Sequence, residues 1–126
     1  MKRVLIAVAL FALLILACCG GYRAVRSTVE ATASEVAHAE TMLQQGAPAA
    51  AIEQLETSHA RWSESRTLLG TMINHTLLDR IDTLYQRAIH CISAGGITQA
   101  FPELAELSAS LQRIIDAERL TVENIL

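Results

Sequence analysis

The chain is poor in aromatic residues and proline, and it has no excess of basic residues. Its 126 residues include only two Phe, two Tyr, one Trp and two Pro, a composition unlike that of a β-sandwich or β-barrel. Lys and Arg number 10 against 13 Asp and Glu, so the formal net charge is −3. A nucleic-acid-binding domain normally carries a basic stripe, so we expect no nucleic-acid partner. The length leaves room for one small domain.

Cysteines and catalytic motifs are also scarce. The three cysteines are Cys18, Cys19 and Cys91, and the first two lie in an apolar N-terminal segment. Cys91 alone cannot form an internal disulfide, which leaves a small buried side chain or an intermolecular link. The sequence contains no G-x-S-x-G, H-E-x-x-H or C-x-x-C motif and no phosphate-binding glycine loop. We therefore expect a protein that is not an enzyme and that uses no cofactor.

What the sequence does contain is one long apolar run near its N-terminus. Residues 4–19 carry no charge and follow Lys2 and Arg3. As a helix this run is about 24 Å long, and counting on to Tyr22 gives roughly 28 Å, close to the thickness of a bilayer core. We expect residues 4–22 to contact the lipid bilayer.

This N-terminal segment, residues 1–26, has three interpretations. It is a retained single-pass spanning helix, a lipoprotein-type signal in which Cys18 after Ala17 becomes lipidated, or an ordinary cleaved signal. All three place residues 27–126 outside the cytoplasm, and we favour the spanning helix in the cytoplasmic membrane. The outer part has six arginines and all 13 acidic residues, a net charge of −7.

Beyond the anchor, apolar residues recur at helical spacing. The pattern predicts four amphipathic helices, at about 27–45, 48–73, 77–94 and 98–119. Gly46 with Pro48, and Gly95 with Gly96, mark two of the turns, and the first helix could continue the membrane helix outward. Short connections favour antiparallel neighbours, so we expect an all-α fold in which a membrane helix precedes an up-and-down bundle.

The turn between the second and third helices has two candidate positions. Gly70 lowers helix propensity, but we favour a break at Asn74 and His75. Residues 76–79 read as a capping box, in which Thr76 caps the third helix and Asp79 reaches back to it.

The strongest candidate for metal chemistry lies at this turn. His75, Asp79 and Asp82 offer imidazole and carboxylate ligands, and His59 or His38 would complete a site. Capping explains Asp79 equally well, and the helix dipole explains Asp82. We therefore keep these residues as weak candidates and expect no metal.

The stripe of the second helix carries three residues of interest. Trp62 is interpreted as a core anchor whose indole N–H finds an acceptor, and it lies on the same face as His59 and Arg66. A buried guanidinium requires an acid, so Arg66 should pair with Asp79, Asp82 or Glu106.

Several residues form a recognisable pattern along the chain: the apolar anchor, Ala51, Ile52, Trp62, His75, Asp79, Ile81, Asp82, Asn124, Ile125 and Leu126. In these residues the chain resembles a small bacterial family catalogued as domain of unknown function 4363. The resemblance implies a membrane-associated, mostly helical protein of unassigned activity and brings no catalytic residues. The pairs Cys18-Cys19 and Gly95-Gly96 depart from it. The terminal Asn124, Ile125 and Leu126 either pack back across the bundle or bind a partner.

Two functions follow as hypotheses. The first is a membrane-anchored, non-enzymatic module that acts through an unknown protein partner or through self-association. The alternative is a ligand- or metal-binding lipoprotein with a site near His59, Trp62 and His75.

Overall fold

The computed structural model describes the backbone of residues 1–125 and the side chains of residues 1–117 and of Arg119. These residues form five helices and no strand. The helices are α1 (Lys2–Gln44), α2 (Pro48–Glu64), α3 (Arg66–Leu69), α4 (His75–Ser93) and α5 (Ile97–Ile125). The predicted all-α class is confirmed.

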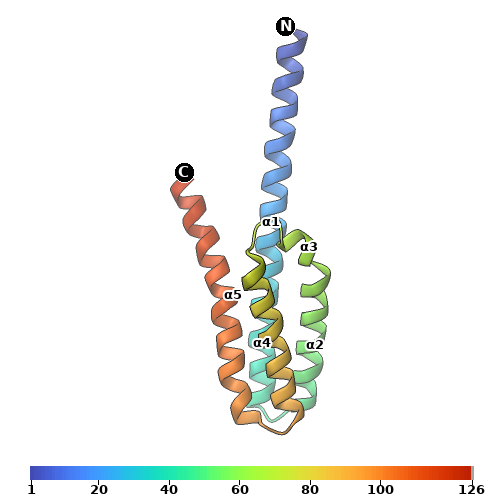
Figure 1. The fold of residues 1–126 in the computed structure, drawn as a ribbon, viewed down its shortest axis with the longest axis vertical. Helices are drawn as coiled ribbons and strands as arrows, with labels where there is room; N and C mark the ends of the chain where they lie inside the picture. Colours follow the sequence, from blue (N-terminus) through green and yellow to red (C-terminus); the bar gives the residue numbers. More distant parts are fainter. Residues whose placement is uncertain (126) are drawn as a thin grey trace.

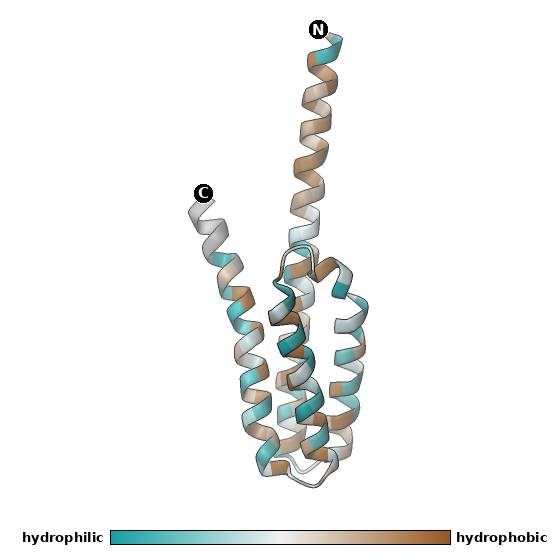
Figure 2. Cartoon of the chain, in the orientation of Figure 1, coloured by the Kyte–Doolittle hydropathy of each residue, from teal (hydrophilic) through white to brown (hydrophobic). Residues whose placement is uncertain are grey.

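Helix α1 is one continuous helix whose first half is exposed and whose second half packs into the bundle. Its 43 residues span about 64 Å. Residues 1–20 are exposed throughout, and this half carries the apolar run, drawn brown in Figure 2. In the other half one face is buried, at steps of three and four residues: Val25, Val29, Thr32, Val36, Ala39 and Leu43. The prediction that the apolar segment and the first bundle helix form one continuous helix is confirmed.

Helices α1, α2, α4 and α5 form an antiparallel four-helix bundle (Figure 1). Helix α1 packs against α2 and α5, and α4 packs against the same two helices. We call the end where α1 leaves the bundle, beside α3, the anchor end. The opposite end, with the α1–α2 and α4–α5 turns, is the far end. The core is aliphatic, with one buried tryptophan and one buried tyrosine, and its largest members are Trp62, Tyr85, Leu55, Leu69, Leu78, Ile81, Leu104, Leu107 and Leu111.

The two turns at the far end need glycine. Gly46 has a φ of +79° and Gly95 a φ of +82°, values that side chains disfavour. The Ala47 N–H donates to the Met42 carbonyl at 2.9 Å, which closes a Schellman motif after α1, and Pro48 then begins α2. The same pattern follows α4, so both predicted turns are confirmed.

The predicted second helix is interrupted earlier than expected. Helix α2 ends at Glu64, α3 ends at Leu69, and residues 70–73 form turns instead of continuing to residue 73. The Thr71 hydroxyl donates to the Leu68 carbonyl at 2.6 Å and so competes with the helical hydrogen bonds. The predicted helix is therefore interrupted first at Ser65, which was not predicted, and again at Gly70, one of the two candidate positions. The preferred break at Asn74 was wrong for the end of this helix.

The start of the next helix also differs from the prediction. Helix α4 begins at His75, not at residue 77, and the Asn74 side chain accepts a hydrogen bond from the Thr76 N–H at 2.8 Å. Thr76 lies inside the helix and the Asp79 carboxylate binds Arg66, so the predicted capping box is wrong. Both Asn and Thr are good caps, and the sequence alone ranked them incorrectly.

Helix α5 is longer at both ends than the predicted 98–119, and Pro102 lies inside it. Its backbone includes Asn124 and Ile125. The predicted packing of these two side chains, and everything about Leu126, lies outside the described residues.

The cap assignment gives a direct test by substitution. Asn74→Ala should lower the free energy of unfolding by about 1 kcal/mol, because it removes the acceptor for an otherwise unpaired N–H. Thr76→Ala is the matched control and should change stability by less than about 0.5 kcal/mol. Urea unfolding of the full chain in detergent, followed by circular dichroism, measures both. A larger loss for Thr76→Ala than for Asn74→Ala would contradict the assignment.

Candidate functional site

A set of charged side chains joins α3 to the first turns of α4. The Arg66 guanidinium donates to Asp79 Oδ1 through Nη2 and to Asp82 Oδ2 through Nη1. The expected pairing of Arg66 with Asp79 and Asp82 is therefore present, whereas Glu106 binds Arg80 instead. The Arg66 side chain is 37% exposed, so the guanidinium lies at the surface and not in the core, as its place in the apolar stripe had suggested.

The second oxygen of Asp82 extends the network inward. His59 Nε2 lies 3.1 Å from Asp82 Oδ1, and the His59 ring stacks on Tyr85 with centroids 4.9 Å apart. The Tyr85 hydroxyl in turn lies 2.7 Å from Ser58 Oγ, and both side chains are buried. The network thus runs from the surface at Arg66 to the bundle core and links α2, α3 and α4.

Two pKa values reflect these surroundings. The hydrogen bond to Asp79, together with the nearby Asp82 charge, raises the pKa of the Arg66 guanidinium above its usual value. Burial raises the pKa of Tyr85 well above the usual tyrosine value, because the core disfavours a phenolate, although the hydrogen bond with Ser58 opposes the shift. Tyr85 is therefore a neutral hydrogen-bonding group throughout the physiological range.

Trp62 is fully buried in the core, as expected of an anchor residue. Its indole N–H has no hydrogen-bond partner among the described atoms, so the expected acceptor is not there. Because none of its surface reaches solvent, Trp62 offers no face on which a ligand at the surface could stack. In the alternative site near His59, Trp62 and His75, Trp62 therefore cannot contact a ligand bound at the surface.

The metal candidates are divided between different contacts. Asp79 and Asp82 both accept hydrogen bonds from Arg66. His75 is exposed at the start of α4, and its imidazole makes no hydrogen bond within the described part of the chain. His38 lies exposed on α1. Among the described side chains, no three His, Cys, Asp or Glu residues are grouped closely enough to hold a metal ion.

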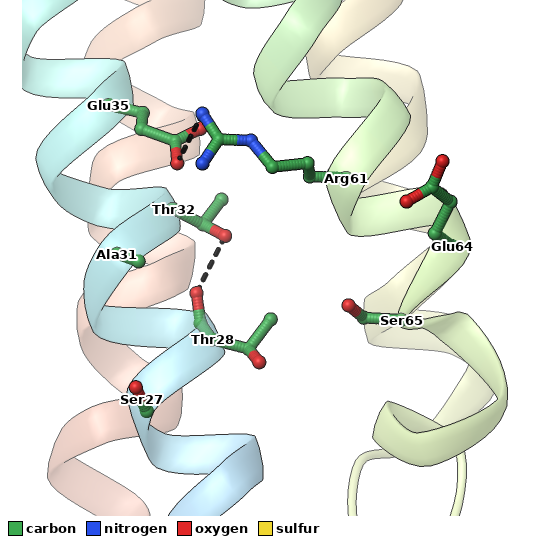
Figure 3. Close-up of a pocket in the computed structure, with 8 residues that line it drawn as sticks. All are labelled: Ser27, Thr28, Ala31, Thr32, Glu35, Arg61, Glu64 and Ser65. Atoms are coloured by element: carbon green, nitrogen blue, oxygen red, sulfur yellow. Dashed lines mark hydrogen bonds and ion pairs between the residues drawn. The ribbon is translucent and has the colours of Figure 1, made fainter.

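A polar groove between α1 and the α2–α3 segment was not predicted (Figure 3). The groove has a volume of about 350 Å³ and is lined by Ser27, Thr28, Ala31, Thr32, Glu35, Arg61, Glu64 and Ser65. Arg61 Nη2 crosses it to Glu35 Oε1 at 2.9 Å, and the second oxygen of Glu35 is buried without a partner among the described atoms. The only signal for it in the sequence is the recurrence of Ser and Thr on one face of α1.

The threonines of this groove are already engaged with backbone. The Thr32 hydroxyl donates to the Thr28 carbonyl at 2.7 Å, and the Thr28 hydroxyl donates to Ala24 at 2.9 Å. The groove therefore offers mainly carboxylate and guanidinium groups, and its Glu35–Arg61 pair ties α1 to α2.

The cysteines remain free thiols. Cys18 and Cys19 are exposed on α1, whereas Cys91 is half-buried and packs against the core. The helix that carries Cys18 is also the one described helix long and apolar enough to cross a membrane.

With this geometry described, comparison with protein families gives one match. The model of the family described as Domain of unknown function (DUF4363) matches residues 20–125. The chain belongs to this family. The match covers the whole bundle and starts where the apolar segment of α1 ends. No curated protein and no solved structure matches the chain.

The buried phenol gives a pH prediction. Because the folded-state pKa of Tyr85 is raised, its contribution to stability is complete below the unfolded pKa of about 10 and is lost as the pH rises further. The free energy of unfolding should fall with a slope of up to about 1.4 kcal/mol per pH unit above pH 10. Urea unfolding of the full chain in detergent at several alkaline pH values measures this slope.

Two variants distinguish the ionisation of Tyr85 from other causes of lost stability at alkaline pH. Tyr85→Phe should reduce the slope, although below pH 10 it lowers stability by leaving Ser58 without its partner. Tyr22→Phe, which changes the other tyrosine, should keep the slope. Equal slopes for the parent and Tyr85→Phe would contradict the account.

Proposed function

We propose that this protein is a membrane-tethered, non-enzymatic interaction module that presents its bundle to a protein partner on the outer face of the cytoplasmic membrane. The observation that carries this proposal is the continuity of α1, which holds the apolar segment and one quarter of the bundle in a single helix. The distance along α1 from Tyr22 to Gln44 is about 33 Å, so the far end stands well away from the lipid.

The distribution of charge favours the far end as the contact surface. In residues 35–56 and 84–107, which form the far half of the bundle, Arg87 is the one basic residue besides histidine. The acidic residues there are Glu35, Glu40, Glu53, Glu56, Glu103 and Glu106. The other arginines of the outer domain lie in the anchor half. The anchor half holds the other seven acidic residues, but five arginines offset them, so the larger net negative charge lies at the far half. This arrangement favours a partner with a basic surface at the far end.

The proposal holds for either form of the anchor. A retained spanning helix and a lipid on Cys18 both tether residues 20–125, and both leave the far end pointing away from the bilayer.

Photo-crosslinking from the far end tests this function. A photoreactive residue at Ala50 or at Ala94, both exposed beside the far-end turns, should give a discrete protein adduct in native membranes. The triple variant Glu40→Gln, Glu53→Gln, Glu56→Gln should lose most of that adduct, because it removes the charge that attracts the partner.

The control removes the same number of acids from the anchor half. Glu30→Gln, Glu64→Gln, Asp116→Asn should keep the adduct. A lack of protein adducts from both positions, or an equal loss in both triple variants, would contradict the proposed function.

A further inference from the structure

Two large apolar side chains of the outer domain are exposed. Leu68 is 38% exposed and Met72 is 46% exposed. Among the described side chains, every other exposed large hydrophobic residue lies in the N-terminal half of α1 or just before it, within residues 1–16. Leu68 lies on α3 and Met72 in the turn that follows, so both belong to the anchor end.

Met72 lies against α1 where this helix leaves the apolar segment. A Cβ atom placed on Gly21 would lie 3.7 Å from Met72 Cε. Since the apolar run ends only two residues earlier, at Cys19, and the first charge follows at Arg23, the turn after α3 lies beside the end of the proposed membrane segment. Figure 2 shows the hydrophobic colour returning in α3 beside this part of α1.

An apolar groove opens at the same end, between this turn and α5. It has a volume of about 320 Å³, and its walls include Met72, Ile73, Leu77 and Ile114, with Arg113 beside them. Aliphatic walls next to a guanidinium match the acyl chain and the phosphate of a phospholipid.

Helix α5 also extends to the anchor end of the bundle (Figure 1). From Ile97 at the far end to Ile125 it extends about 42 Å, against about 33 Å from Gln44 back to Tyr22 on α1. Figure 1 shows α5 continuing past the α3–α4 connection, on the side toward which the apolar half of α1 extends. The sequence at its end is apolar at Leu120, Val122 and Ile125.

We propose that the anchor end of the bundle is a lipid-binding surface, in which Leu68, Met72 and the groove beside Arg113 enter the headgroup region of the outer leaflet. This inference rests on the membrane tether of the proposed function. Its occupant is phospholipid of the same bilayer, because Met72 contacts the helix that enters it. The bundle then stands on the membrane surface and is not free to swing above it.

Quenching of tryptophan fluorescence by lipid tests the proposal. The full chain carrying Leu68→Trp or Met72→Trp is reconstituted into vesicles of phosphatidylcholine and phosphatidylglycerol, with and without bromine on the acyl chains near the headgroup. The emission added by either new tryptophan should fall roughly twofold in brominated vesicles, because interfacial side chains lie within about 10 Å of the headgroup–acyl boundary. The emission of Trp62 is common to all variants and is subtracted.

Two further variants serve as the negative and the positive control for quenching. Ala49→Trp, exposed at the far end, should not be quenched, and Cys19→Trp, at the end of the apolar run, should be quenched. Quenching of Cys19→Trp without quenching at positions 68 and 72 overturns this inference and leaves the tether intact. Loss of quenching at Cys19→Trp as well contradicts the tether and so the proposed function. Circular dichroism checks the fold, and Leu68→Trp carries the test if Met72→Trp unfolds.

Discussion

The structure depends on one helix remaining unbroken between its apolar N-terminal half and the four-helix bundle. The apolar half is long and apolar enough to cross a bilayer, where every backbone N–H and C=O needs an internal partner of the kind that a helix supplies. Beyond Tyr22 the same helix persists because its stripe of valine, alanine and leucine is covered by α2 and α5. Gly20 and Gly21 lie at the junction and stay helical, so the anchor passes directly into the core without a linker. The position of every other helix relative to the apolar segment follows from this continuity.

The polar network organises the anchor end of the bundle. Arg66 holds α3 against α4 through Asp79 and Asp82, and Asp82 is in turn oriented by His59, which stacks on Tyr85. In the sequence, Asp79 and Asp82 were weak candidates for a metal site, whereas their contacts in the structure join α3 to α4. Fixing α3 also fixes the turn that carries Met72 next to Gly21. The network and the two exposed apolar side chains, Leu68 and Met72, therefore belong to one local arrangement at the anchor end.

Periodicity predicted most of the fold, because helices that bury one face repeat their apolar residues every three or four positions. The far-end turns were predictable as well, since only glycine tolerates the backbone at Gly46 and Gly95. The errors in helix boundaries include the interruption at Ser65 and the ends of α5. Others fall between Gly70 and Asp79, where Asn74 and Thr76 compete as caps and where the partner of Asp79 lies 13 residues away on α3. Contacts between helices were the main omission. Nothing local in the sequence pairs Ser58 with Tyr85 or Glu35 with Arg61, because each pair forms only after two helices pack together.

The central claim is that α1 is one rigid helix from the apolar segment to the far end of the bundle. Pulsed electron paramagnetic resonance tests it with spin labels at Ala12→Cys and Ala37→Cys, both exposed positions on α1, in the full chain with Cys18, Cys19 and Cys91 replaced by serine. In lipid nanodiscs the account predicts a single narrow distance distribution centred near 38 Å, the rise of 25 helical residues at about 1.5 Å each. A broad distribution, or one centred at a clearly shorter distance, would show a hinge at Gly20 and Gly21 and contradict the account.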